Sequence, residues 1–383
     1  MTKIDSILQK LAILSISLML ASNNAISGAL VYIQEAFDLT RSSTEFIVSL
    51  SSLTTIIFIF LAEYIALLIG MKKTVLLGLS LVSVSGLIPV FFKTYPAILL
   101  SRIILGSGLG LFNGHSANYI NLLYKDDGER TKLHALRNAT ESIGQILMYT
   151  LAGILIRINF IYTFLVYFIA IFIFIFFKIE VRDVDLNEEH SKLRLDSNIV
   201  LFIFFAMLMI LNVIAMTNRF PFVASLASGL DVNVSFYLNL IPVVGMLSSI
   251  LFTPINRKIR ENTILLGIGL YIFANFLIMR FDQSLWGFLL CILLVTFAQS
   301  LCMPYIFAEV PRYVKGHSSR FATNLIFIGC NLGTFFAPLF MKAVDGILKT
   351  NSLSNSFIAF VFIYLILFII FVRRNRYKKR SGF

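Results

Sequence analysis

The sequence predicts an all-α membrane protein with twelve transmembrane helices in two pseudo-symmetric six-helix bundles, and three observations lead to this prediction. The chain of 383 residues is 58% hydrophobic and only 14% charged, with a mean hydropathy of +0.87. Its apolar stretches reach about 20 residues, the length that crosses a hydrocarbon core of roughly 30 Å. The sequence also repeats its own landmarks at a shift of 189 residues. A soluble protein has too little polar surface to cover this composition.

Twelve apolar stretches can be placed along the chain. Their centres lie near residues 21, 57, 83, 110, 146, 168, 211, 244, 271, 297, 330 and 363. Only helices fit, because in lipid each backbone amide must be satisfied within its own segment. The first stretch is too long for a signal-peptide core and has no small-residue cleavage site, so we interpret it as the first helix.

The internal repeat indicates a duplicated unit. At the shift of 189 residues the segment 74–78 falls on 263–267, Asn23 on Asn212, Gly144 on Gly333, and the basic loop at Lys72 and Lys73 on the one ending at Arg260. Duplicated helical halves are the architecture in which many secondary transporters form a binding site. The repeat therefore indicates transport.

The charged stretch 178–198 is the one plausible boundary between the two halves. We predict a bundle at 1–177, a cytoplasmic linker at 178–198, a second bundle at 199–372 and a basic cytoplasmic tail at 373–383. No segment is large enough for a soluble catalytic domain, and no phosphate-binding loop follows a strand. We therefore expect no enzyme activity, no ATP-driven mechanism in this chain and no cofactor.

The net charge of +12 reflects topology. With the N-terminus in the cytoplasm, the cytoplasmic segments hold 24 Lys and Arg, the outer loops hold 6, and Arg102 and Arg219 lie within spans. This bias predicts a multi-pass protein of the cell membrane with both termini cytoplasmic. The basic tail is then an anchor at the bilayer surface rather than a nucleic-acid site. The three cysteines have neither disulfide nor metal-ligand spacing.

A motif in the fourth helix resembles a known family. Residues 99–110 (LLSRIILGSGLG) place Gly106 four residues after Arg102, with further small residues at alternate positions. An arginine inside an apolar span is costly and rarely accidental. Over essentially its whole length the chain resembles the major facilitator superfamily, and it looks like the small Gram-positive efflux-type permeases. The resemblance implies that Arg102 takes part in proton coupling.

The loop between the second and third helices departs from the family pattern Gly-x-x-x-Asp-(Arg/Lys)-x-Gly-(Arg/Lys)-(Arg/Lys). Gly70 and Lys72 are kept, while Leu67 stands at the Asp position. Glu63, a turn earlier, is a candidate substitute for that acid. Gly70, Lys72 and Lys73 either form a cytoplasmic gate at the negative ends of neighbouring helices or serve only to retain the loop in the cytoplasm.

The fifth helix departs from the pattern of drug–proton antiporters. Its segment 144–153 (GQILMYTLAG) has Met148-Tyr149 where those proteins carry Gly-Pro, and a proline occurs in the other half as Ala337-Pro338. The overall resemblance favours export, whereas this substitution favours uptake.

Candidate functional residues lie mainly in the N-terminal half. Arg102, Gly106 and Asn113 share one face of the fourth helix, which we expect to line a cavity, and Gly108 and His115 point toward a packed face. Arg102 either acts on a carboxylate or an anionic group as a fixed cation or ties the backbone carbonyls of the first helix.

Glu141 in the fifth helix is either a proton carrier or a cap paired with Arg137, four residues earlier. Gln145 lies one turn deeper on the same face. At the shift of 189 residues Arg102 falls on Cys291 and Glu141 on Cys330, so we expect the charge chemistry in the N-terminal half.

Amide side chains are candidates for a substrate cavity. Asn23 and Asn24 lie near the middle of the first helix, Asn212 near the middle of the seventh, and Gln299 in the tenth. They either hydrogen-bond a substrate or link helices. Arg219 either reaches the outer surface or contacts an anion.

The leading interpretation is proton-coupled export of small amphipathic molecules or drugs by alternating access, in a monomer within the lipid bilayer. The runner-up is proton-coupled uptake of a small organic solute. An intramembrane enzyme would need clustered acid, base and nucleophile or metal ligands, and the four histidines (115, 134, 190 and 317) are scattered. A sensor would need an output domain.

Overall fold

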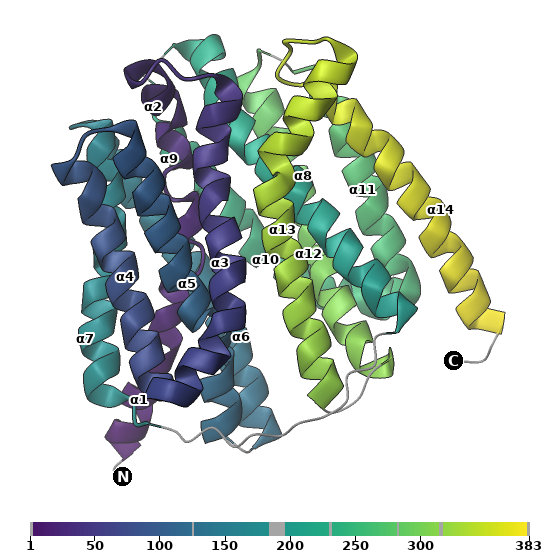
Figure 1. The fold of residues 1–383 in the computed structure, drawn as a ribbon. Helices are drawn as coiled ribbons and strands as arrows, with labels where there is room; N and C mark the ends of the chain where they lie inside the picture. The colour runs from purple at the N-terminus through teal and green to yellow at the C-terminus, as the bar shows by residue number, and fades with distance from the viewer. Residues whose placement is uncertain are drawn as a thin grey trace. The chain divides into compact units, whose positions relative to one another are not determined.

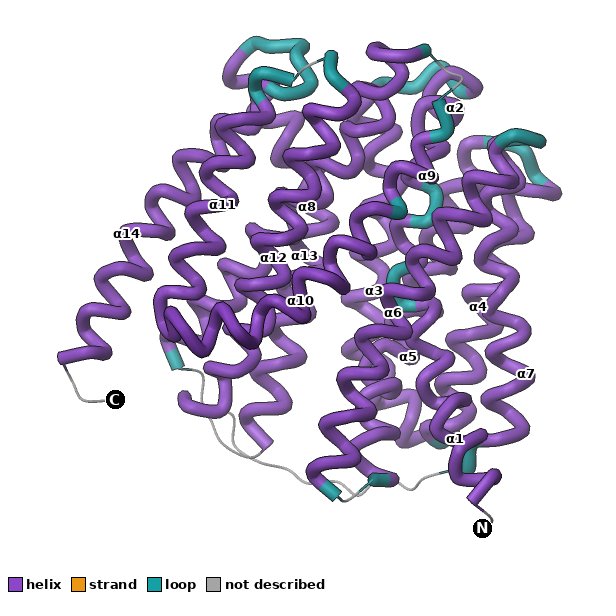
Figure 2. Tube along the Cα trace, turned by 180° about the vertical axis from the view of Figure 1, so that it is seen from behind, coloured by secondary structure: helices purple, strands orange, loops and turns teal. Residues whose placement is uncertain are grey.

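The computed structural model describes residues 3–124, 126–183, 196–229, 232–281, 283–313 and 317–380, and within these ranges its regular structure is entirely helical (Figure 1, Figure 2). The chain divides into two compact units, Met1–His190 and Ser191–Phe383, which we call unit 1 and unit 2. Most of the predicted linker lies outside the described residues.

The described residues of unit 1 form six membrane-length helical segments. They are built from α1 (Lys3–Ser15), η1 (Ile16–Met19), η2 (Ser22–Asn24), η3 (Ser27–Ala29), α2 (Leu30–Ala36), α3 (Arg41–Ile69), α4 (Met71–Phe91), α5 (Tyr95–Leu123), α6 (Asp127–Ile156), η4 (Phe160–Ile169) and α7 (Ala170–Glu180). Polar residues before three of the apolar runs fix where the helices begin. The side chains of Thr40, Thr94 and Asp126 accept hydrogen bonds from backbone N–H groups in the first turns of α3, α5 and α6, which satisfies donors that have no partner within the helix.

Unit 2 repeats this plan. It comprises α8 (Ser197–Ser228), α9 (Val234–Leu238), α10 (Leu240–Ile259), η5 (Arg260–Asn262), α11 (Thr263–Ile278), α12 (Leu285–Tyr313), α13 (His317–Leu348), η6 (Asn355–Phe357) and α14 (Ile358–Arg380). The basic segment from Arg373 continues α14 as far as Arg380 and does not form a separate tail.

Eleven helical runs in the described residues are long and apolar enough to cross a membrane. Every predicted segment centre falls within one of them. The eighth and ninth predicted segments share the 45-residue run Val234–Ile278, because η5 joins α10 to α11 without a non-helical break. The transmembrane fold predicted from hydropathy is confirmed.

The 189-residue repeat has a direct counterpart in packing. A Cβ added to Gly144 would overlap the backbone carbonyl of Leu18, and one added to Gly333 would overlap that of Met207. Leu18 and Met207 are themselves related by the same shift. Each unit therefore brings its fifth helix against its first at a glycine, where only a hydrogen atom fits.

The first and seventh segments differ in continuity. Between α1 and α2 the first segment is a series of short 3₁₀ turns, η1 to η3, whereas α8 runs unbroken for 32 residues through Pro221. The sixth segment also begins with a 3₁₀ stretch, the ten residues of η4. Such breaks free backbone carbonyls that must find other donors at membrane depth.

Candidate functional site

The broken first segment of unit 1 carries the predicted amide pair. Asn23 and Asn24 lie in η2 and are half-buried. The Asn23 side chain donates to the Ser52 hydroxyl of α3 at 3.4 Å. The side-chain oxygens of both asparagines are buried and have no hydrogen-bond partner among the described residues. A ligand that donates hydrogen bonds would satisfy them.

Arg102 of α5 is fully buried and links this break to its neighbours. Its guanidinium donates to five oxygen atoms at 2.6 to 3.2 Å: the backbone carbonyls of Asn23, Ile47 and Val48, and the hydroxyls of Ser51 and Tyr167. These acceptors belong to η2, α3 and η4. All five are uncharged, so in this structure the guanidinium ties backbone carbonyls together, and no carboxylate is among the acceptors.

The expectation that the Arg102 face of α5 lines a cavity is wrong at two of its positions. Arg102 has no exposed surface, and a Cβ on Gly106 would overlap the backbone carbonyl of Ser51. Gly108, on the face expected to pack, indeed meets the backbone of Gly78 in α4. Both faces of α5 therefore pack against neighbouring helices here, and small residues allow the close approach. Further along α5, Asn113 is half-buried.

In α6 the predicted carboxylate has the predicted neighbour. Glu141 is half-buried, and its charge interacts with that of Arg137. Arg137 is itself buried and donates from Nε to the Ser116 hydroxyl of α5 at 2.9 Å. One turn deeper, Gln145 donates to the Tyr149 hydroxyl at 3.4 Å. Tyr149 is buried and adds a polar group that the sequence prediction did not include.

At the turn between α3 and α4, the acidic residue that lies beside Gly70 is Asp183. Gly70 has φ +90°, a conformation that favours glycine. The backbone N–H of Lys72 donates to Asp183 Oδ1 at 3.4 Å. Glu63 is exposed, as is Lys73. Asp183 follows α7, far from this loop in sequence, so the loop motif gave no sign of it.

Unit 2 holds Asn212 in a buried amide pair. Asn212 and Asn275 exchange reciprocal hydrogen bonds of 2.8 and 2.9 Å between α8 and α11, and neither has exposed surface. The second amide proton of Asn275 goes to the Tyr271 carbonyl at 2.8 Å. This geometry supports the helix-linking interpretation of Asn212. Gln299 of α12 is half-buried.

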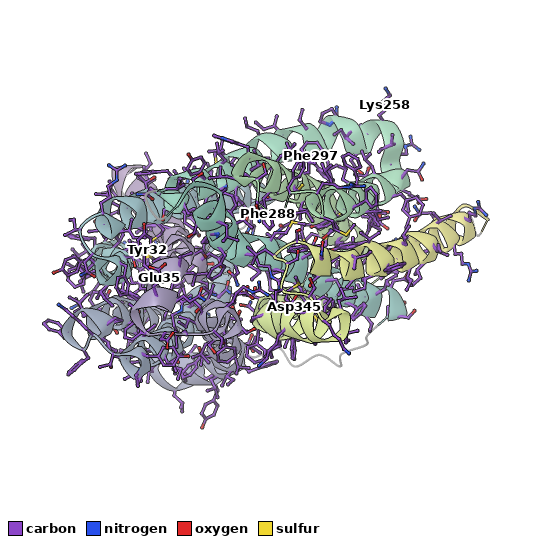
Figure 3. The ribbon with its side chains drawn as sticks, turned by 90° about the horizontal axis from the view of Figure 1, so that it is seen from above. Tyr32, Glu35, Lys258, Phe288, Phe297 and Asp345 are labelled. Atoms are coloured by element: carbon purple, nitrogen blue, oxygen red, sulfur yellow. The ribbon has the colours of Figure 1, made fainter. Side chains whose placement is uncertain are left out.

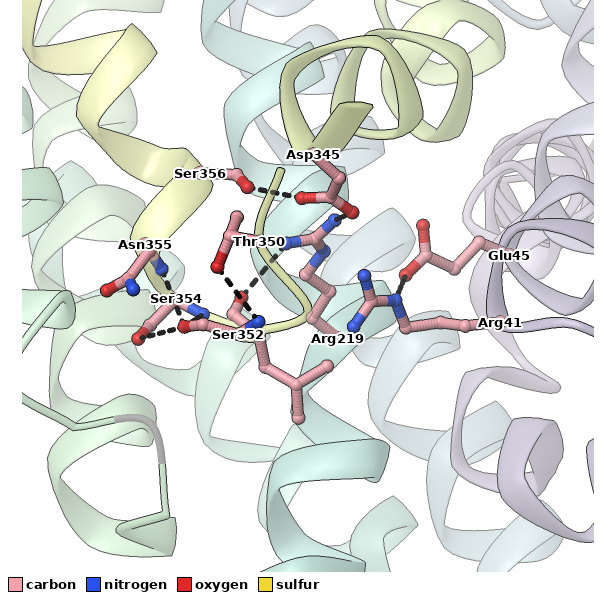
Figure 4. Close-up of polar contacts among 10 residues, drawn as sticks. Arg41, Glu45, Arg219, Asp345, Thr350, Ser352, Ser354, Asn355 and Ser356 are labelled. Carbon is pink, nitrogen blue, oxygen red and sulfur yellow. Dashed lines mark hydrogen bonds and ion pairs between the residues drawn. The ribbon is translucent and has the colours of Figure 1, made fainter. Parts of the chain in front are cut away.

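Of the two alternatives for Arg219, the structure excludes the one in which its side chain reaches the outer surface. Arg219 is 1% exposed in α8, and its Nη2 lies 2.6 Å from Asp345 Oδ2 of α13 (Figure 4). Its Nη1 donates to the Leu353 carbonyl at 3.1 Å, and the Ser356 hydroxyl donates to the other oxygen of Asp345. The pair therefore ties α8 and α13 to the connection before α14.

A second arginine whose side chain has little exposed surface lies at the opposite end of unit 2. Arg374 of α14 lies 3.4 Å from a Glu309 carboxylate oxygen and donates to the Tyr313 hydroxyl at 2.6 Å. Its guanidinium also lies over the Phe202 ring, 4.8 Å from the centroid. Such contacts combine charge with cation–π attraction. Unit 2 therefore also holds charged side chains with little exposure, at Arg219 and at Arg374.

Comparison with known proteins defines the family. A family model described as Major Facilitator Superfamily matches residues 12–338. The chain belongs to this superfamily. Members of this superfamily are membrane transporters, so membership supports membrane transport and not enzymatic catalysis. A search of curated proteins found no match.

Solved structures of superfamily transporters match nearly the whole chain. A D-xylose-proton symporter has a TM-score of 0.75 and 16% identity, and the match covers 97% of each chain. A POT family transporter in complex with 5-aminolevulinic acid has a TM-score of 0.78 and 12% identity over 95% of each chain. The nucleoside transporter NupG has a TM-score of 0.71 and 14% identity over 97% of this chain and 99% of that one. At these identities the similarity establishes the fold.

Proposed function

We propose that the protein is a proton-coupled secondary transporter that exports small amphipathic molecules by alternating access, and that it works as a monomer in the cell membrane. The observation that supports this most is the polar centre of unit 1. A buried arginine, Arg102, there stabilises a broken helix, and the side-chain oxygens of Asn23 and Asn24 in that helix have no partner among the described residues. Broken helices with irregular backbone are typical of binding sites at membrane depth.

We propose that the substrate meets the amides of unit 1. Asn23 and Asn24 offer unsatisfied side-chain oxygens, and the half-buried Gln145 and Asn113 offer both donors and acceptors. These groups favour a substrate with hydroxyl or amine donors beside an apolar body. Asn212 and Arg219 are instead occupied by Asn275 and Asp345, so we assign them structural links.

We propose Glu141 as the group that carries the proton. A carrier exchanges its proton inside the protein rather than at the surface, and intramembrane carboxylates commonly have this role. Glu141 is half-buried, whereas Glu63 is exposed. Arg137 beside Glu141 compensates its charge when the proton leaves.

Uptake of a polar solute by proton symport is the second candidate. The observation that favours it is Tyr149, which occupies the place of the proline in the Gly-Pro pair of drug–proton antiporters. Tyr149 is buried and accepts a hydrogen bond from Gln145. A hydroxyl and an amide at this place suit a solute with several hydrogen-bonding groups.

Transport in vesicles with an imposed pH gradient tests coupling and direction together. Right-side-out and inverted vesicles would be loaded with dyes, drugs, sugars and nucleosides. We expect gradient-driven movement of at least one of these, lost in Glu141→Gln and retained in the control Glu63→Gln. Substrate transport at a rate that does not depend on the pH gradient would show that proton coupling is wrong. Coupled transport retained in Glu141→Gln would remove that residue from the proposal.

Replacing Arg102 separates its two interpretations. Lysine keeps the charge but cannot span five acceptors on three elements, because it lacks the planar fork of arginine. If Arg102 holds the first segment in shape, Arg102→Lys loses transport nearly as fully as Arg102→Met. If its charge alone matters, the lysine variant keeps coupled transport. Transport rates and substrate affinity of both variants measure the difference, and we expect the first result.

A further inference from the structure

Five exposed basic residues lie at one end of unit 2, on two segments far apart in sequence. Arg257, Lys258 and Arg260 lie at the α10–η5 turn, and Arg373 and Arg376 lie near the end of α14. Lys258 points away from the helices (Figure 3). These residues have no part in the proposed transport site.

One hydrogen bond holds the two segments side by side. Asn375 is buried, and its side chain donates to the backbone carbonyl of Glu261 at 2.8 Å. Its neighbour Arg374 is turned inward and bound to Glu309 and Tyr313. Because these two residues anchor α14 from inside, the flanking Arg373 and Arg376 remain on the outer side. The half-buried Glu261 is the acid that lies within this basic region.

The same face of α14 continues as an apolar strip. Phe362, Ile366 and Ile369 are 61, 60 and 54% exposed. With Arg373 and Arg376 they follow the spacing of one helix face, at alternating steps of four and three residues. This face therefore presents about two turns of apolar side chains that end in two guanidinium groups.

Arg260 occupies a strained backbone position within this region. Its φ of +49° and ψ of −117° lie where residues with a Cβ are disfavoured. Such a conformation is energetically costly and is commonly kept at sites with a function. A glycine would relieve the strain but would remove the charge.

We propose that this region of unit 2 binds an anionic phospholipid. One acyl chain lies along Phe362, Ile366 and Ile369, and the phosphate meets Arg373 and Arg376. The turn residues Arg257, Lys258 and Arg260, on the side of α14 that Asn375 faces, add to the positive potential of the same end of unit 2. Guanidinium groups bind phosphate oxygens with two parallel hydrogen bonds. Basic pockets between transmembrane helices are known to hold anionic head groups.

Lipid titration of the purified, delipidated full chain tests this proposal. Native mass spectrometry would count adducts of phosphatidylglycerol and of phosphatidylcholine. We expect phosphatidylglycerol to bind more tightly, and we expect Arg373→Gln with Arg376→Gln to weaken it by about 30-fold, since each basic residue near a head group contributes roughly a fivefold effect. Phosphatidylcholine binding should not change.

The matched control removes two exposed arginines elsewhere, Arg157 and Arg280, as Arg157→Gln with Arg280→Gln. This control should bind phosphatidylglycerol as the native chain does. Should the α14 variant fold poorly, Arg257→Gln with Lys258→Gln probes the same site from the other segment. Equal binding of the two lipids by the native chain, as expected if the region instead binds a soluble acidic protein, would overturn the proposal. An equal loss in the control would do the same.

Discussion

The buried ion pair Arg219–Asp345 gives the sharpest test of how unit 2 is held together. The guanidinium is 1% exposed and lies 2.6 Å from the carboxylate. Asp345→Asn keeps the shape of the side chain and removes its charge, so a buried cation loses this compensating partner. Breaking a buried pair from one side costs about 3–5 kcal/mol, because the remaining charge stays desolvated. We expect a loss of about this size.

Thermal unfolding of the detergent-purified chain measures this loss. A cost of 1 kcal/mol lowers the melting temperature of a unit this large by roughly 2–4 °C, so Asp345→Asn should lower it by about 6–20 °C. Arg219→Met should also destabilise, since it leaves the carboxylate without this partner. The double variant should be more stable than the sum of the single effects predicts, with a coupling of about 0.5–3 kcal/mol. Glu63→Gln, at an exposed position, is the control.

Additive effects would refute this reasoning. If the double variant loses as much stability as both single variants together, the two side chains do not stabilise each other. If Asp345→Asn unfolds at the same temperature as the control, the guanidinium has enough other partners without the carboxylate. Either result would show that other contacts hold α8 against α13.

Two further predictions concern the packing of the repeat and the amide pair. Gly144→Ala and Gly333→Ala should each cost about 1–3 kcal/mol of stability, because the added methyl overlaps a backbone carbonyl. The control Gly346→Ala places its methyl in open space and should gain up to about 1 kcal/mol of helix propensity. Melting temperatures of the three variants measure these effects. Asn212→Ala should cost about 1–3 kcal/mol, because the side-chain oxygen and one amide proton of Asn275 lose their partner, while replacing both residues by leucine should be nearly neutral. If the leucine pair is stable but no longer transports, Asn212 contacts substrate as well as its partner.

Hydropathy and the internal repeat were sufficient to predict the fold. A span needs only length and apolar composition, both of which are local properties of a sequence. The match of Gly144 to Gly333 in the sequence corresponds to equivalent positions in the two units, since both glycines permit the same backbone contact. The break in the first segment was not predicted, although Ser22, Asn23, Asn24, Ser27 and Gly28 are residue types that favour turns and caps over helix interiors. Its stabilisation depends on Arg102, 79 residues away from Asn23.

The partners of the polar residues could not be predicted from one sequence for the same reason. Asp345 is a single acid near the end of an apolar run, and nothing local connects it to Arg219, 126 positions earlier. Asn275 likewise gives no sign that it pairs with Asn212. Buried polar groups need partners, but the sequence shows the need without showing which residue meets it. Two candidate cavity residues therefore became structural links.

Arg102 of unit 1 differs from the arginines of unit 2 in how its positive charge is compensated, and this difference bears on where proton coupling would occur. In unit 2, Arg219 and Arg374 each lie against a carboxylate, Asp345 and Glu309, so their charges are neutralised within the unit. In unit 1, Arg102 is stabilised by uncharged oxygens. A negative charge added near Arg102 would be attracted to a cation that no carboxylate among the described residues compensates. The arginines of unit 2 would attract such a charge less, because carboxylates already compensate them. A proton leaving a carboxylate, or an anionic substrate arriving, would therefore change the electrostatic energy of unit 1 most, which argues for coupling in the half that holds Arg102 and Glu141.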